Sequence, residues 1–182
     1  MPNRDWDATN GFEDPVDWIT TLSPKCTNGT SQRYRPSGRP AVHPDGSLLT
    51  VAGSVPPTVY VLQNGQKRGI PTPERLRELY GPGRGFDFTD IIIVEQDELN
   101  QYPTGAPVPV SEPIFDSGLC EPAGRLIQQD GREEISIVTG DCIRRPFGLG
   151  QAFLRLGYST CNVWQIFDYS DPIYTVGPPI TQ

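Results

Sequence analysis

The sequence predicts an α+β fold in which two tandem copies of one small module follow an extended N-terminal arm. An internal repeat that keeps its apolar register is the first reason. Residues 86–108 align without a gap onto 158–180, and Tyr102 then coincides with Tyr174. A proline-rich first segment that matches neither copy is the second reason. We therefore divide the chain into an arm (1–40), a first module (41–110) and a second module (111–182).

Two further blocks match in the same order along the chain. DGSLLTVAG at 45–53 corresponds to AGRLIQQDG at 123–131. VYVLQNGQKRGIP at 59–71 corresponds to EISIVTGDCIRRP at 134–146. Matching blocks in a conserved order favour a duplication over chance similarity. The first copy also carries two insertions rich in Gly or Pro, which we place at turns: 55–58 and 81–85.

Each module is expected to begin with a three-stranded hairpin sheet. Its first strand is predicted at 47–52 and, in the second copy, at 125–129. A hairpin follows, because Asn64-Gly65 is a preferred two-residue turn and lies between residues that favour strands. Alternate positions of the next strand are expected to share a core face: Tyr60, Leu62, Ile135 and Ile137.

One helix is predicted after the sheet. In the first copy Thr72 is the expected N-cap and Pro73 the first helical residue. Apolar residues at helical spacing mark its buried side and that of its counterpart: Leu76, Leu79, Tyr80, Phe153 and Leu156. Gly157 is expected to end the second helix.

One buried strand and a short terminal helix complete each module. The most apolar run of the chain, 91–94, predicts a strand that is buried on both faces, and 163–167 matches it. The terminal helix is predicted within DELNQY in the first copy and DYSDPIY in the second.

The segments DGSLLTVAG, VYVLQNGQKRGIP and FDFTDIIIVEQDELNQYPTG carry a family resemblance. Residues 45–106 resemble a short module with a Val-Tyr-Leu-Ile-x-Asn-Gly-x-Lys-Arg-x-Ile-Pro core that recurs in secreted and cell-surface bacterial proteins. The chain departs from it at Gly69, where an aromatic residue is usual, and at the GPGRG insertion. The second copy holds Cys142 and Ile143 at the Lys-Arg positions. The resemblance implies an accessory, surface or adhesive role and transfers no catalytic residue.

Four cysteines favour an oxidising compartment. Cys142 and Cys161 are both absent from the first copy, so we predict that they form a disulfide, which would stabilise the fold by about 3 kcal/mol. For Cys26 and Cys120, a second disulfide and free buried thiols remain the two alternatives. The chain has no C-x-x-C spacing and one histidine, so no metal site is expected.

Composition excludes several classes of function. The net charge of −7 and the scattered basic residues argue against a nucleic-acid partner. No segment has the roughly 18 apolar residues of a membrane span. The only histidine, His43, is expected to be a turn residue, and no nucleophile motif or phosphate-binding loop is present. We therefore expect neither an enzyme nor a cofactor.

The arm is expected to need a surface to lie on, because ordering its backbone costs about 1 to 2 kcal/mol per residue. Five apolar residues are its expected anchors: Trp6, Phe12, Trp18, Ile19 and Leu22. Asn28-Gly29-Thr30 is an N-glycosylation acceptor, used only in a glycosylating compartment. The first twenty residues contain no secretory signal.

The leading hypothesis is a structural subunit of an extracellular filament or virion-type assembly. Copies of the chain would associate head to tail through their modules and the arm, giving a secreted, cell-surface or virion protein fibril. The alternative is a monomeric tandem module that binds cell wall or glycan. Aromatic residues of the second copy and the face of Lys67 and Arg68 would then contact the polymer.

Overall fold

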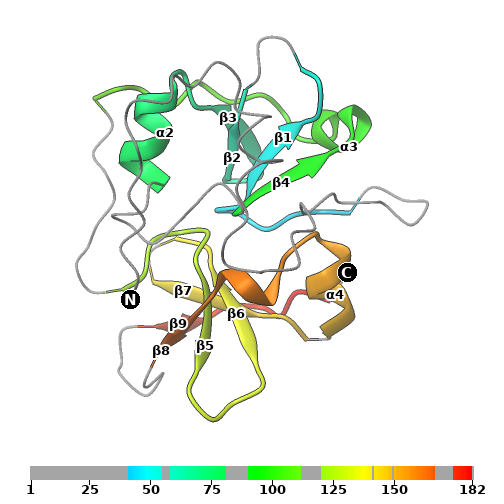
Figure 1. Ribbon diagram of the computed structural model, residues 1–182, viewed down its shortest axis with the longest axis vertical. Helices are drawn as coiled ribbons and strands as arrows, with labels where there is room; N and C mark the ends of the chain where they lie inside the picture. Colours follow the sequence, from blue (N-terminus) through cyan, green and yellow to red (C-terminus); the bar gives the residue numbers. More distant parts are fainter. Residues whose placement is uncertain are drawn as a thin grey trace.

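The structure is an α+β fold with two mixed sheets and a few short helices (Figure 1). It is a computed structural model. It describes residues 41–54, 58–80, 90–111, 120–140, 142–148, 150–166 and 174–181. The predicted arm, 1–40, and residues 168–173 of the predicted terminal helix of the second module lie outside these residues.

The first sheet has four strands in the order β3-β2-β1-β4. The strands are β1 (Leu48–Val51), β2 (Tyr60–Gln63), β3 (Gln66–Gly69) and β4 (Ile91–Val94). β1 pairs antiparallel with β2 and parallel with β4, while β2 and β3 form the predicted hairpin. The predicted buried strand is therefore the fourth strand of the hairpin sheet rather than a separate element.

The hairpin turn at Asn64 and Gly65 follows from local chemistry. Both residues have positive φ, 54° and 69°, as a type I′ turn requires. Asp45 fixes the turn from outside, because its carboxylate accepts hydrogen bonds from both backbone amides at 2.9 Å. The prediction of a two-residue turn is confirmed.

Two helices cover opposite faces of this sheet (Figure 1). α2 (Pro73–Tyr80) begins as predicted, since Thr72 Oγ1 accepts a hydrogen bond from the Arg75 amide at 3.1 Å. On the face of the sheet that α2 covers, Leu76 packs in one apolar cluster with Val61 of β2. On the other face, α3 (Gln96–Asn100) places Leu99 in a second cluster with Leu62. β2 is thus buried on both faces, where one core face was predicted.

The second sheet has five strands in the order β8-β5-β6-β7-β9. The strands are β5 (Leu126–Gln129), β6 (Ile135–Val138), β7 (Ile143–Pro146), β8 (Val163–Ile166) and β9 (Thr175–Val176). β5 pairs antiparallel with β6 and parallel with β8, as β1 does with β2 and β4. A helix, α4 (Gly150–Arg155), follows β7 as α2 follows β3, and a 3-10 turn, η3 (Thr160–Asn162), precedes β8.

The strand register corrects one part of the sequence alignment. Leu48 lies opposite Val61 and Leu126 opposite Ile137, so Ile137 corresponds to Val61. The second hairpin turn, 140–142, is one residue longer than Asn64-Gly65, because Thr139 N bonds to Ile143 O. The gapless match of 59–71 to 134–146 is therefore wrong by one residue in the second strand and by two in the third.

After this correction, Arg144 and Arg145 correspond to Lys67 and Arg68, and the Lys-Arg pair has a basic counterpart in the second half. The contacts agree. Arg68 Nε donates to Ala106 O at 2.9 Å, and Arg145 Nε donates to Pro178 O at 2.8 Å. In both halves this arginine bonds the hairpin to the C-terminal segment of its half, at Ala106 in the first half and at Pro178 in the second. Cys142 stands in the turn and not at a Lys position.

The larger of the two apolar clusters spans both halves, while the smaller lies within the first half. One cluster joins Leu62 and Leu99 of the first half to Phe147, Phe153 and Tyr158 of the second. Phe147 and Phe153 contact each other edge to face, with ring centroids 5.2 Å apart. The boundary between 110 and 111 is thus not a boundary between separate cores.

Candidate functional site

The halves meet where corresponding residues face each other. Gly46 and Gly124 both precede the first strand of their sheet, with φ of 91° and 90°. A Cβ placed on Gly46 would lie 2.4 Å from the Gly124 amide nitrogen. A small cleft at this contact is lined largely by corresponding pairs: Gly46 and Gly124, Leu48 and Leu126, Asp90 and Asn162. Equivalent residues that meet in pairs indicate an approximate two-fold relation between the halves.

Tyr158 joins the second half to the first at the same place. Its hydroxyl lies 2.6 Å from Ser47 Oγ, which also donates to Pro44 O at 2.7 Å. Ser47 therefore accepts a hydrogen bond from Tyr158, because its own proton is used. Burial raises the pKa of Tyr158, so this hydroxyl keeps its proton at physiological pH.

A buried ionisable pair lies beside Tyr158. His43 Nε2 is 3.6 Å from Glu98 Oε1, and both side chains are fully buried. Gln101 Nε2 donates to Glu98 Oε1 at 2.8 Å and to Ala41 O at 2.6 Å. Tyr102 accepts a hydrogen bond from the His43 amide at 2.7 Å. α3 and the residues after it thus fix the chain at the point where it enters the first sheet.

Burial sets the charge of this pair. It lowers the pKa of His43 to about 4 and raises the pKa of Glu98 to about 7, against the lowering effect of the hydrogen bonds to Glu98. His43 is therefore neutral at physiological pH, and it is not the turn residue that the sequence suggested. A buried neutral imidazole with a buried carboxyl can fix local structure, but it does not face a substrate.

The pH dependence of the free energy of unfolding tests the burial of His43 and Glu98. The pKa of His43 is depressed, so its effect is a loss of stability as pH falls from 6.5 through about 4. The pKa of Glu98 is raised, so its effect is a gain as pH falls from about 7 to 4.5. The two effects offset between about pH 4.5 and 6.5, so a net loss of stability is expected only as the pH falls from 4.5 to about 4 and as it rises from 6.5 to about 7.

Because His43 is the only histidine, one NMR signal reports on it. We expect a midpoint near pH 4 in the folded protein and near pH 6.5 in urea. A folded midpoint close to 6.5 would contradict the buried site.

The Ser47–Tyr158 hydrogen bond gives a second test at the junction. Tyr158→Phe removes one hydroxyl and leaves the ring in place. We expect the free energy of unfolding to fall by about 1 kcal/mol, as for a buried neutral hydrogen bond. In a double-mutant cycle with Ser47→Ala, the two effects should not add, whereas additive losses would show that the hydroxyls do not interact.

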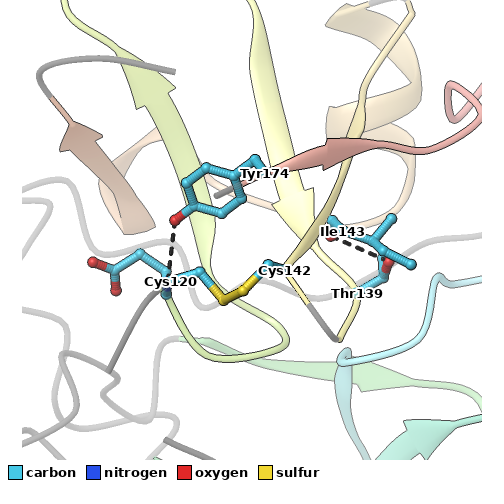
Figure 2. Close-up of a disulfide and its surroundings, with 6 residues drawn as sticks. Cys120, Thr139, Cys142, Ile143 and Tyr174 are labelled. Carbon is cyan, nitrogen blue, oxygen red and sulfur yellow. Dashed lines mark hydrogen bonds between the residues drawn. A yellow bond between two sulfur atoms is a disulfide. The ribbon is translucent and has the colours of Figure 1, made fainter. Parts of the chain in front are cut away.

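The disulfide at the β6–β7 turn of the second sheet differs from the predicted pairing (Figure 2). Cys120 is bonded to Cys142, with a Cα–Cα distance of 5.6 Å, so Cys142 does not pair with Cys161. Cys142 lies in the turn between β6 and β7, whereas Cys161 directly precedes β8, which β5 separates from this hairpin. Near the bond, Tyr174 Oη accepts a hydrogen bond from the Glu121 amide at 3.1 Å.

Because Cys120 is disulfide-bonded, the alternative of a free thiol is wrong for this residue. Cys161 is disulfide-bonded too. Cys26 and Asn28 lie outside the described residues, as do the expected anchors Trp6, Phe12, Trp18, Ile19 and Leu22. Within the described part of the chain, no three His, Cys, Asp or Glu side chains gather as they would around a metal ion. In the same residues, no helix has the length and apolar character of a membrane span.

The junction itself was missed by the sequence reasoning. The match of Gly46 to Gly124 places both residues before the first strand of a copy, but nothing in a linear alignment shows that the two would touch. The spacing between His43 and Glu98 gives no signal either, because their contact depends on how α3 packs.

Comparisons with protein-family models, with curated proteins and with solved structures found no match.

Proposed function

We propose that the chain is a tandem duplication of one module and acts as a non-catalytic structural subunit. It associates with further copies of itself in an extracellular filament or virion-type assembly, with the arm 1–40 bridging neighbours. The observation that carries the proposal is the contact of Gly46 with Gly124. Inside the chain, one copy of the module already packs against the other through corresponding residues, so the module associates with its own kind.

The equivalence of the halves supports the duplication. Their first four strands pair in the same sequence of antiparallel and parallel neighbours. Arg68 and Arg145 make the same backbone contact. Tyr102 accepts a hydrogen bond from the His43 amide, and Tyr174 accepts one from the Glu121 amide. Side-chain contacts of this detail are typical of a common ancestor module rather than of shared topology alone.

The chemistry of the described residues fits a structural role outside the cytosol. The Cys120–Cys142 disulfide is stable in oxidising compartments. The only histidine is buried with a lowered pKa, which makes it a poor acid or base for a substrate in solution. The resemblance to a module of bacterial surface proteins points to the same setting.

The internal contact also limits how an assembly grows. An approximate two-fold contact pairs equivalent surfaces and is used up once two copies have met. Growth from chain to chain therefore needs other surfaces, and the arm is one of them.

Analytical ultracentrifugation and electron microscopy of the oxidised full chain test the proposal. We expect species far above the 20.1 kDa chain mass and regular particles or filaments. Trp6→Ser, Phe12→Ser and Trp18→Ser together should shorten these assemblies. A monomer at all concentrations would reject self-assembly and favour the glycan-binding alternative, for which the partly exposed ring of Trp164, near Arg125, is the surface to test.

A further inference from the structure

The sheet edges differ in how they are protected. β3 is covered by the segment after α3, because Gly105 N donates to Lys67 O and Val108 N donates to Gly69 O, both at 2.9 Å. β9 has only two residues and is followed within one residue by Pro178 and Pro179, which have no backbone N–H to donate to a further strand. All four side chains of β4 are buried. These three edges are poor templates for another strand.

Among the described residues, none protects the edge of β8 in these ways. It lies at the edge of the five-stranded sheet, with β5 as its one neighbour among the described strands. Its sequence, VWQI, contains no charge and no proline. Trp164 is 39% exposed, and Gln165 is exposed too. An apolar, uncharged edge strand is a template for pairing with a further strand.

The backbone of Gln165 is the part that faces outward. Ile166 O accepts a hydrogen bond from the Asp130 amide, so Ile166 directs its backbone toward β5. Alternate residues direct their backbone groups to opposite sides, so Val163 and Gln165 point away from β5. The Val163 amide already donates to Thr160 O at the end of η3. No described residue bonds to the outward amide or carbonyl of Gln165, so both groups are offered at the edge of the described sheet.

We propose that β8 pairs antiparallel with β8 of a second copy of this chain, centred on Gln165. This inference rests on the proposed self-assembly and names one of its surfaces. At that register the two Gln165 residues exchange both backbone hydrogen bonds. Trp164 of each chain lies opposite Ile166 of the other on one face, an aromatic and β-branched pair that stabilises sheets.

The alternative register, centred on Trp164, fits less well. It would place Gln165 opposite Val163 of the second copy, whose amide is already bonded within its own chain. One of the two hydrogen bonds of each such pair would be lost. On the other face, the side chain of Gln165 already bonds to Gln128 of β5 at 2.7 Å, so the Gln165-centred register extends an existing polar row across the interface.

Charge at position 165 tests this pairing in the full-length chain. Gln165→Lys and Gln165→Glu each place like charges opposite each other across the two-fold, which opposes pairing. We expect each variant to have at least a twofold lower weight-average mass than the unmodified chain by sedimentation. Mixing the two variants in equal amounts should restore the mass, because opposite charges then face each other. Gln151→Lys, on the exposed side of α4, is the matched control and should change nothing.

Each other outcome rejects either the proposed self-assembly or the β8 contact alone. If the unmodified chain is a monomer, the proposed function fails together with the β8 contact. If it assembles and Gln165→Lys assembles equally well, or if the mixture is not restored, the β8 contact alone fails. If Trp18→Asp lowers the mass as Gln165→Lys does and the mixture is not restored, the arm occupies the edge in place of a second β8.

Discussion

Gly46→Ala is expected to lower the free energy of unfolding by about 3 kcal/mol or more. Two costs combine at this position. The left-handed backbone, with φ of 91°, strains any residue that carries a Cβ, at about 1 to 3 kcal/mol. The new methyl group would also lie 2.8 Å from Gly124 Cα, and its near neighbours are all backbone atoms of Ala123 and Gly124, which cannot rotate away as a side chain could. Overpacking of this kind costs about 1 to 3 kcal/mol more.

Gly131→Ala separates the two costs. Gly131 has φ of 74°, but a Cβ there would meet no atom within 4 Å. Only the backbone strain remains, so we expect a loss of about 1 kcal/mol. Urea denaturation of both variants measures the difference. Equal losses would mean that the halves do not touch at Gly46, and the proposed association of the module with its own kind would lose its basis.

Removing the Cys120–Cys142 disulfide is expected to have the second large effect. The bond closes a sequence separation of 22 residues and ties the entry of the second half to the β6–β7 turn. The chain-entropy estimate for such a loop is about 3 kcal/mol. We expect Cys120→Ala with Cys142→Ala to lower the free energy of unfolding by this amount in urea, without loss of the first sheet.

Peptide mapping without reduction is the independent control for this prediction. It should recover a peptide in which Cys120 is joined to Cys142. A peptide that joins Cys142 to Cys161 would instead support the pairing expected from the sequence, and it would contradict the Cys120–Cys142 bond of the structure. The two cysteine substitutions would then be expected to expose Cys161 as a reactive thiol.

The junction connects these results to function. If Gly46 and Gly124 hold two copies of one module together, substitutions there should disturb both halves at once. If β8 holds two chains together, Gln165→Lys should leave stability nearly unchanged and alter only the mass. The internal contact and the external contact can therefore be separated by measuring stability and association on the same variants.

The sequence alone determined the features that depend on neighbouring residues. Asn64-Gly65 specified its turn because both residues tolerate positive φ, and Thr72-Pro73 specified the start of α2 because the hydroxyl can cap the helix. The run 91–94 specified a buried strand by its apolar character alone. These effects act between neighbouring residues, so the order of residues along the chain is enough to predict them.

Only the tertiary structure decided which distant groups meet. The second hairpin is shifted by one residue before its second strand and by one more in its longer turn, and an apolar pattern cannot report single residues gained or lost in polar connections. That shift gave Arg144 and Arg145 their places and took Cys142 to Cys120. The His43–Glu98 pair likewise exists because α3 packs on the first sheet. Contacts of this kind arise from packing between elements, whose free energy depends on shape and burial rather than on sequence spacing.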